Sequence, residues 1–252
     1  MDIIEKQYQT PAHLYTRISI HEKYSVNKQP FGDWIYSHYS IAPGDRVLEL
    51  GCGTADMWKG RLPFVQEGVQ LILTDFSKGM LDSAMENTAG QASGYALVDI
   101  RDIPFEDGSF DVVIANMMLY HVPDLARGLS EVRRVLRPGG VFYCATYGEN
   151  GIMAYINETL KDHGIQGHVG NTFTLQNGRQ SLEVYFDQVE KLTREDGLAI
   201  TEPGDFVSYV LSMSSLTGIV QGCEKLLLET FSDRMENGIL YVPKEYGMFI
   251  CK

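Results

Sequence analysis

Two glycines and two carboxylates in the first third of the chain have types and spacing that could bind a small ligand. Gly51 and Gly53 flank Cys52 directly after an apolar run, Glu49 interrupts that run, and Asp75 ends the next one. Glycine lacks a Cβ, so the main chain can turn sharply there and approach a ligand closely. A carboxylate about 20 residues after such a turn is placed to accept hydrogen bonds from the hydroxyls of a ribose. The pattern therefore predicts a nucleoside site.

The charges around the glycine turn indicate which kind of nucleoside it binds. A dinucleotide fingerprint has a third glycine three residues after the second, but Asp56 occupies that position here. Glu49 adds a second negative charge on the other side of the turn. Two carboxylates disfavour a pyrophosphate and favour a ligand with a cationic end. We expect a positively charged nucleoside at this turn.

Alternating apolar strands and amphipathic helices are expected to position these residues. Such alternation indicates a parallel sheet with helices on both faces. A helix near Thr54 would aim free N–H groups at the turn. Ser77 and Asp124 are expected to begin helices. Residues 164–180 are polar and rich in glycine, which predicts a loop. Strands are expected at 47–50, 69–74, 95–98, 110–115, 141–146, 188–194 and 246–251, and later helices at 153–161, 206–213 and 219–235.

Four motifs occur in order along this framework: ELGCGT (49–54), TDFSKGML (74–81), VDIRDIPFEDGSFDVVIANMMLYHV (98–122) and RRVLRPGG (133–140). Together they resemble class I S-adenosylmethionine-dependent methyltransferases, with the UbiE-like small-molecule branch as the nearest match, over roughly residues 45–148. The resemblance implies a doubly wound, Rossmann-like α/β fold, with a mostly parallel seven-stranded sheet and an antiparallel last strand. It also implies a helical cap at 1–44, a methyltransferase domain at 45–252, and lid segments at 150–185 and 203–237.

The same resemblance implies S-adenosylmethionine as methyl donor, leaving S-adenosylhomocysteine as product. Glu49 would lie beneath the amino-acid end of the donor and position its ammonium group indirectly, although it could instead pair with a loop N–H or an arginine. The residues expected around the methionine end are Glu49, Gly51, Cys52, Gly53, Thr54, Asn116 and Met117.

Five further residues are expected around the ribose and adenine. Asp75 would bind the ribose, Phe76 and Met80 would form apolar walls, Asp99 would accept from the adenine amino group, and Ile100 would pack on the ring. Structural roles remain open for several of them. Asp75 could cap the next helix, Asp99 could cap a turn, and Phe76 and Met80 could belong to the core.

The methyl acceptor is expected to be a small molecule, attacked in line at the sulfonium methyl carbon. Such a transfer needs alignment and exclusion of water, and a base only if the nucleophile is protonated. His121 is the candidate base, with a structural histidine at a helix start as the alternative reading. His21 and Tyr24 in the cap are further catalytic candidates. The 14 tyrosines suggest an aromatic pocket for a planar or apolar acceptor.

Composition excludes several other classes of protein. A net charge of −12 disfavours nucleic acid or an anionic membrane as a partner. No apolar stretch reaches transmembrane length and no signal-peptide pattern occurs, so a cytoplasmic location is expected. The protein is expected to be a monomer or a homodimer. The four cysteines form no C-x-x-C pair, and no cluster of histidines and carboxylates has metal-ligand spacing. An NAD(P)-dependent oxidoreductase and a non-catalytic nucleoside-binding module remain as alternatives.

Overall fold

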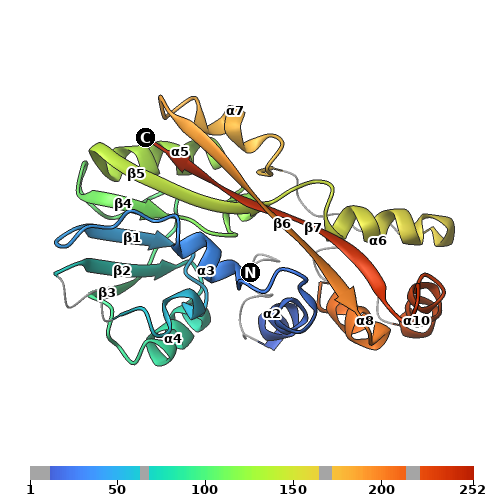
Figure 1. Ribbon diagram of the computed structural model, residues 1–252. Helices are drawn as coiled ribbons and strands as arrows, with labels where there is room; N and C mark the ends of the chain where they lie inside the picture. Colours follow the sequence, from blue (N-terminus) through green and yellow to red (C-terminus); the bar gives the residue numbers. More distant parts are fainter. Residues whose placement is uncertain (1–11, 63–67, 165–171, 214–221) are drawn as a thin grey trace.

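A seven-stranded sheet is the framework of the protein, which we describe from a computed structural model that covers residues 12–62, 68–164, 172–213 and 222–252. The strand order is β3-β2-β1-β4-β5-β7-β6. The pairs among β1 to β5 are parallel, and β7 runs antiparallel to both β5 and β6. The α/β fold predicted from the sequence, with its antiparallel last strand, is confirmed (Figure 1).

Helices cover both faces of this sheet and surround one end of it (Figure 1). The strands are β1 (Arg46–Leu50), β2 (Gln70–Asp75), β3 (Gly94–Leu97), β4 (Phe110–Ile114), β5 (Leu136–Tyr147), β6 (Val189–Ile200) and β7 (Leu240–Cys251). The helices are α2 (Ala12–Tyr24), α3 (Phe31–Tyr36), α4 (Lys78–Asn87), α5 (Leu125–Val135), α6 (Ile152–Leu160), α7 (Gly178–Leu182), α8 (Pro203–Ser212) and α10 (Glu224–Ser232), with 3-10 turns η1 (Asp56–Trp58), η3 (Leu119–His121) and η4 (Lys161–His163).

Local sequence signals determine where two central helices begin. The Ser77 side chain accepts a hydrogen bond from the Met80 N–H at the start of α4, and the Asp124 carboxylate accepts one from the Arg127 N–H at the start of α5. Both side chains satisfy backbone donors that a first helical turn leaves unpaired. The two predicted helix starts are confirmed.

The structure corrects three sequence-based expectations about elements. The helix expected near Thr54 is only the short 3-10 helix η1, which begins two residues later because Ala55 adopts a left-handed conformation (φ +54°). Residues 178–182 form α7, whereas a loop was expected up to 180. Strands β5, β6 and β7 are each 12 residues long, about twice the expected length. β6 and β7 pair without interruption from Val189 with Cys251 to Ile200 with Leu240. Residues 1–11, 165–171 and 214–221 of the expected cap and lids lie outside the described residues.

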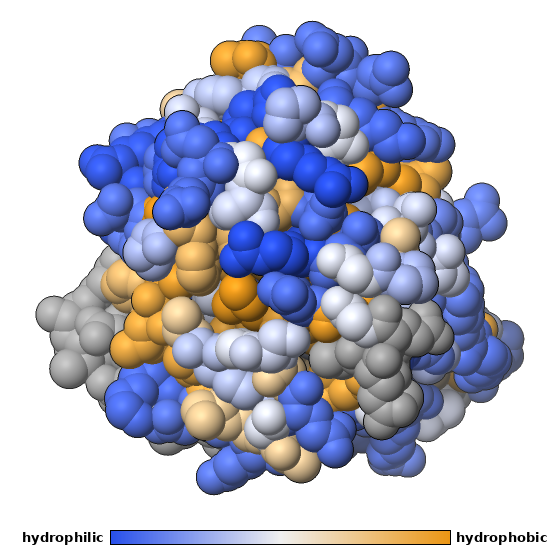
Figure 2. Space-filling view, turned by 90° about the vertical axis from the view of Figure 1, so that its left-hand side faces the viewer, coloured by the Kyte–Doolittle hydropathy of each residue, from blue (hydrophilic) through white to orange (hydrophobic). Residues whose placement is uncertain are grey.

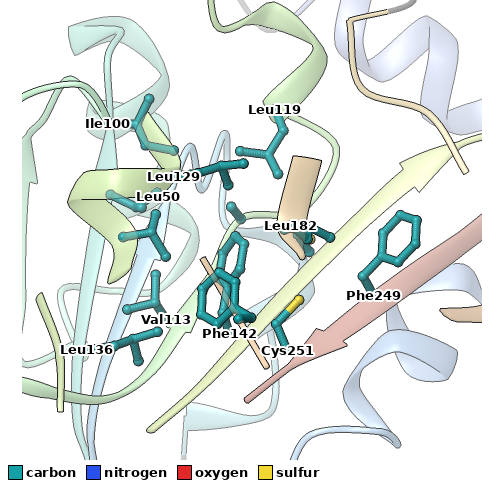
Figure 3. Close-up of a cluster of buried hydrophobic side chains, with 14 of the residues drawn as sticks. Leu50, Ile100, Val113, Leu119, Leu129, Leu136, Phe142, Leu182, Phe249 and Cys251 are labelled. Carbon is teal, nitrogen blue, oxygen red and sulfur yellow. The ribbon is translucent and has the colours of Figure 1, made fainter. Parts of the chain in front are cut away.

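The apolar side chains form three buried clusters. Successive strand residues point to opposite faces, so Val47 joins the cluster beneath α3, η1 and α4, while Leu48 joins the cluster beneath α5 and α7. Figure 3 shows part of the latter, where Leu129 of α5 and Leu182 of α7 meet strand side chains such as Phe142.

The third cluster, which we call the second core, lies beyond the five parallel strands. It is built by α2, α6, α8 and α10 on the half of the β6–β7 ribbon that extends beyond the other strands, on the right of Figure 1. Ile156, Leu198, Phe206 and Phe231 are among its fully buried members. The molecule therefore has a second core, and this core faces the carboxyl ends of the parallel strands.

The opposite edge, at the amino ends of β1 and β2, has a different surface. There hydrophilic side chains predominate around smaller apolar areas (Figure 2). Within the described residues, no helix is long and apolar enough to cross a bilayer. No group of three or more potential metal ligands gathers among those residues either.

Candidate active site

A cavity of about 600 Å³ lies between the carboxyl ends of the parallel strands and the second core. This is the edge of an open α/β sheet at which ligands bind. Its lining includes every site residue predicted from the sequence except Glu49 and Tyr24: Gly51, Cys52, Gly53, Thr54, Asp75, Phe76, Met80, Asp99, Ile100, Asn116, Met117, His21 and His121.

The glycine turn after β1 has the backbone geometry that its residues predict. Gly51 and Gly53 have φ angles of +66° and +57°, which favour glycine. A Cβ on Gly51 would come within 2.9 Å of Cγ of Met118, which also lines the cavity. The Cys52 N–H donates to the Thr74 carbonyl over 2.8 Å and so joins the turn to β2. The turn is open at Gly53, where a Cβ would meet nothing within 4 Å, and is packed against Met118 at Gly51.

Asp75 connects the ends of β1 and β2. Its Oδ2 accepts a hydrogen bond from the Gly53 N–H (2.9 Å) and its Oδ1 accepts one from the Ser77 N–H (2.8 Å). Burial raises the pKa of this carboxyl, while the amide donors act in the opposite direction. The carboxylate is thereby fixed in orientation beside the cavity, with lone pairs still available to a ligand. Ser77 caps α4 itself, so Asp75 is not needed for that role.

Glu49 lies behind the cavity wall and is only 4% exposed. The indole N–H of Trp58 donates to its Oε2, and the Thr74 hydroxyl donates to its carbonyl over 2.7 Å. Burial raises the pKa of Glu49 to about 7, and the nearby charge of Asp75 acts in the same direction. The sequence predicted a loop N–H or an arginine as the partner of this buried carboxylate. The partner in the structure is the indole of Trp58, which the sequence did not indicate.

Asp99 lines the cavity, but its carboxylate is held by its own neighbour. Oδ1 accepts from the Arg101 N–H (2.9 Å), and Oδ2 accepts from the guanidinium over 2.6 Å, which lowers the pKa of Asp99. An aspartate that accepts from the N–H two residues on is an Asx turn. The geometry thus favours the turn-capping alternative over binding of an adenine amino group.

The side chain of Asn116 also has protein partners at both ends. Its Nδ2 donates to the Tyr39 hydroxyl (2.6 Å) and its Oδ1 accepts from the Ala145 N–H (3.2 Å). It therefore joins β4 to β5 and to the segment after α3. The next residue, Met117, has φ +53°, a conformation that non-glycine residues seldom adopt and that places Met117 and Met118 in the cavity wall.

The apolar residues predicted for the adenine lie together in the lining. Met80 of α4 and Ile100 are buried, whereas Phe76 is 55% exposed. A large aromatic side chain left in solvent at a cavity edge is unusual for core packing. The core alternative fits Met80 and does not fit Phe76.

Two of the three catalytic candidates, His21 and His121, line the cavity. Burial, together with the positive charge of Arg17, lowers the pKa of His121 to about 4. Burial, followed by the charge of Lys244, lowers the pKa of His21 to about 3, and its Nε2 lies 3.4 Å from the Tyr246 hydroxyl. Both imidazoles are neutral near neutral pH.

Tyr24, the third catalytic candidate, points away from the cavity. It is buried in the second core, and its hydroxyl donates to Asp205 of α8 over 2.6 Å. The expectation that it faces the acceptor was therefore wrong. Arg17, Phe31, Tyr209 and Tyr246 line the cavity instead. They come from α2, α3, α8 and β7, and no motif in the sequence joins them.

A family model described as "Methyltransferase domain" matches residues 48–144, the segment that carries β1, β4, the glycine turn and Asp75. Residues 48–144 therefore match a methyltransferase domain, as the four motifs predicted. The resemblance seen in the four motifs is confirmed.

Curated relatives of this chain have more than one name. It is 34% identical to malonyl-[acyl-carrier protein] O-methyltransferase of Serratia marcescens over 118 residues, 46% of this chain and 43% of that protein. It is 29% identical to demethylmenaquinone methyltransferase of Symbiobacterium thermophilum over 232 residues, 79% of this chain and 88% of that protein. It is 36% identical to the Staphylococcus epidermidis enzyme of that name over 44% of this chain and 46% of that protein. The chain thus spans less than half of two of these three relatives.

Solved structures support the same fold. A Bacillus halodurans protein described as a candidate methyltransferase aligns with a TM-score of 0.61 at 18% identity, covering 87% of this chain and 97% of that chain. Haemonchus contortus phosphoethanolamine N-methyltransferase 2, in complex with S-adenosylhomocysteine, aligns with a TM-score of 0.60 at 18% identity over 99% of this chain and 59% of that one. At these identities the comparison concerns fold alone.

Proposed function

We propose that this protein transfers the sulfonium methyl of S-adenosylmethionine to a nucleophile on a small molecule by in-line displacement. The observation that carries the proposal is the Asp75 carboxylate, fixed by the amides of Gly53 and Ser77 at the wall of a large cavity in a class I methyltransferase fold. That arrangement presents a rigid acceptor for a ribose next to an uncovered main-chain turn.

The residues present fit this donor. A Cβ at Gly53 would meet nothing within 4 Å, so the main chain there is open and can contact the methionine moiety, whereas Met118 fills the space beside Gly51. Asp75 would hold the ribose, and Phe76, Met80 and Ile100 would enclose the adenine. When bound, the donor supplies an electrophilic methyl group on a good leaving group.

The remaining work of the protein is to orient the acceptor and to exclude water. Glu49 acts from behind the wall through Trp58 and the turn, as a positioning residue. His21 and His121 face the acceptor side as neutral hydrogen-bonding groups. We assign the second core, with α2, α6, α8 and α10, as the cap over the site. A cytoplasmic monomer or homodimer stays a prediction from the sequence.

The alternatives receive no support from the relatives, which are named as methyltransferases of two different acceptors. Asp56 at the position of a third glycine also disfavours a nicotinamide dinucleotide. Because the two relatives differ in acceptor, they support methyl transfer to a small molecule without identifying which one.

Calorimetry and product analysis test the proposal together. We expect S-adenosylmethionine and S-adenosylhomocysteine to bind and NADH not to bind. Incubation of a metabolite extract with a donor carrying an isotopically labelled methyl group should yield a labelled product detectable by mass spectrometry. Binding of NADH alone would reject the proposal, and donor binding without any labelled product would support the non-catalytic binding module.

A further inference from the structure

A buried cluster of charges lies directly behind the acceptor side of the cavity. Arg194 and Lys244 both form ion pairs with Asp196, and the three side chains are at most 2% exposed. Asp196 also accepts hydrogen bonds from the Ser25 hydroxyl (3.0 Å) and the Asn27 N–H (3.1 Å). Two cations and one carboxylate leave the cluster with a net charge of +1.

Only one aromatic layer separates this cluster from the cavity. The Arg194 guanidinium lies 5.9 Å from the ring centre of Phe31, and the Lys244 ammonium lies 5.2 Å from that of Tyr246. The two rings are 5.2 Å apart and both line the cavity. A buried charge is poorly screened, so its field extends through a single ring. The same cations lower the pKa of His21, whose ring is edge-on to Tyr246.

A further cation lies in the cavity wall itself. Arg17 of α2 lines the cavity. Its positive charge adds to the effect of burial in lowering the pKa of His121, and it opposes the rise that burial causes in the pKa of Tyr209, so its charge acts on this side of the cavity. Five carboxylates also line the cavity: Asp56 and Asp99 follow β1 and β3, Asp75 ends β2, Glu149 follows β5, and Glu245 belongs to β7. Glu149 is exposed, and the Glu245 oxygens accept from the Asn150 N–H (2.7 Å) and from Gln176 (2.8 Å) at the solvent-accessible rim. Solvent screens those two charges more than the buried ones.

We propose that the acceptor of this methyltransferase is an oxyanion, a small aromatic or apolar molecule whose ionised carboxylate or acidic hydroxyl is held against Phe31 and Tyr246 by the field of Arg194, Lys244 and Arg17. This inference rests on the proposed function. The acceptor oxygen gains the methyl carbon, the carbon–sulfur bond breaks with its electron pair remaining on sulfur, and no proton moves. Neutral imidazoles of low basicity are consistent with such a reaction, since none has to act as a base.

A matched pair of probes tests the charge preference. Binding of trans-cinnamate and of cinnamamide, which have nearly the same shape, is measured by calorimetry on protein saturated with S-adenosylhomocysteine. We expect the acid to bind about tenfold more tightly than the amide. Equal affinities, tighter binding of the amide, or no binding of either at millimolar concentration overturns the inference.

Lys244→Met identifies the cluster as the source of the preference. It leaves the Arg194–Asp196 pair neutral, so the preference for cinnamate should largely disappear while the affinity for cinnamamide stays the same. Lys23→Met removes the same charge from an exposed position on α2 and should retain the preference. A preference that survives in Lys244→Met contradicts the assignment. If that variant does not fold, Arg17→Gln serves in its place, with the same loss expected.

Two further measurements complete the test. 4-Nitrophenol, which is yellow only when ionised, tests whether the site also accepts a phenolate: an increase in its yellow colour on binding, at a pH below its solution pKa, indicates that acidic hydroxyls are bound in the ionised form. Binding of S-adenosylhomocysteine, measured on the wild type and on each variant, separates the proposed methyl transfer from the proposed oxyanion acceptor. If the wild type does not bind S-adenosylhomocysteine, methyl transfer itself is rejected. If it binds S-adenosylhomocysteine but does not prefer cinnamate over cinnamamide, only the oxyanion acceptor is rejected.

Discussion

The indole N–H of Trp58 donates a hydrogen bond to the carboxylate of Glu49, and both side chains are buried behind the turn that faces the cavity. Burial raises the pKa of Glu49 from 4.5 to about 7. Between these two values the folded protein retains a proton that the unfolded chain has released, so stability falls as the pH rises through this range and changes no further above it. At 1.36 kcal/mol per pKa unit, the loss is on the order of 3 kcal/mol.

Glu49→Gln should remove this pH dependence. The glutamine oxygen can still accept from Trp58, and no charge has to be buried. In urea unfolding of the ligand-free protein, we expect the variant and the wild type to be similar at pH 5 and the variant to be more stable at pH 8 by a few kcal/mol. Other titrating groups cancel in the difference between the two proteins. A difference that does not change with pH would contradict the raised pKa.

Asp75→Ala should weaken the binding of S-adenosylhomocysteine by at least about tenfold, since it removes a charge-assisted hydrogen bond to the ribose and releases the Gly53 amide. Calorimetry measures the change. Asp82→Ala, on the exposed side of α4 beside Lys78, is the matched control and should bind as the wild type does. Unchanged affinity in Asp75→Ala would reject the ribose assignment.

Gly51→Ala should destabilise the protein through backbone strain and through a steric clash, and Gly44→Ala is a control that has the strain alone. Gly51 and Gly44 both have positive φ angles, but a Cβ on Gly44 meets nothing within 4 Å, whereas one on Gly51 meets Met118 at 2.9 Å. Backbone strain alone should cost Gly44→Ala about 1 kcal/mol. We expect Gly51→Ala to lose more stability in urea unfolding and to lose affinity for the donor, which Gly44→Ala should retain. Equal effects of the two substitutions would show that the contact with Met118 has no consequence.

His121→Ala should leave donor affinity within about twofold of the wild type while reducing methyl transfer, because His121 lines the cavity in the part that we propose binds the acceptor. With its pKa near 4, the histidine should cause no change in activity between pH 6 and 8. Donor binding by calorimetry and product formation from the labelled donor measure the two effects. Loss of donor binding in this variant would show that His121 contacts the donor and not the acceptor.

Part of the candidate site could be predicted because it depends on short stretches of chain. The glycine turn, Asp75, and the caps at Ser77 and Asp124 are each defined by residues within one strand, turn or helix start, where backbone conformation follows residue type. The Asx turn at Asp99 is equally local, and its partner Arg101 is only two residues away. The residues that we propose hold the donor could therefore be found from the sequence.

The acceptor half was decided by tertiary structure. Phe31, Tyr209 and Tyr246 meet only because the β6–β7 ribbon extends 12 residues and brings α8 and the cap helices over the sheet. Packing of that second core also turned Tyr24 toward Asp205 and away from the cavity. Side-chain direction in such a cap depends on contacts between segments up to about 200 residues apart, and periodicity or spacing along the chain contains no information about those contacts.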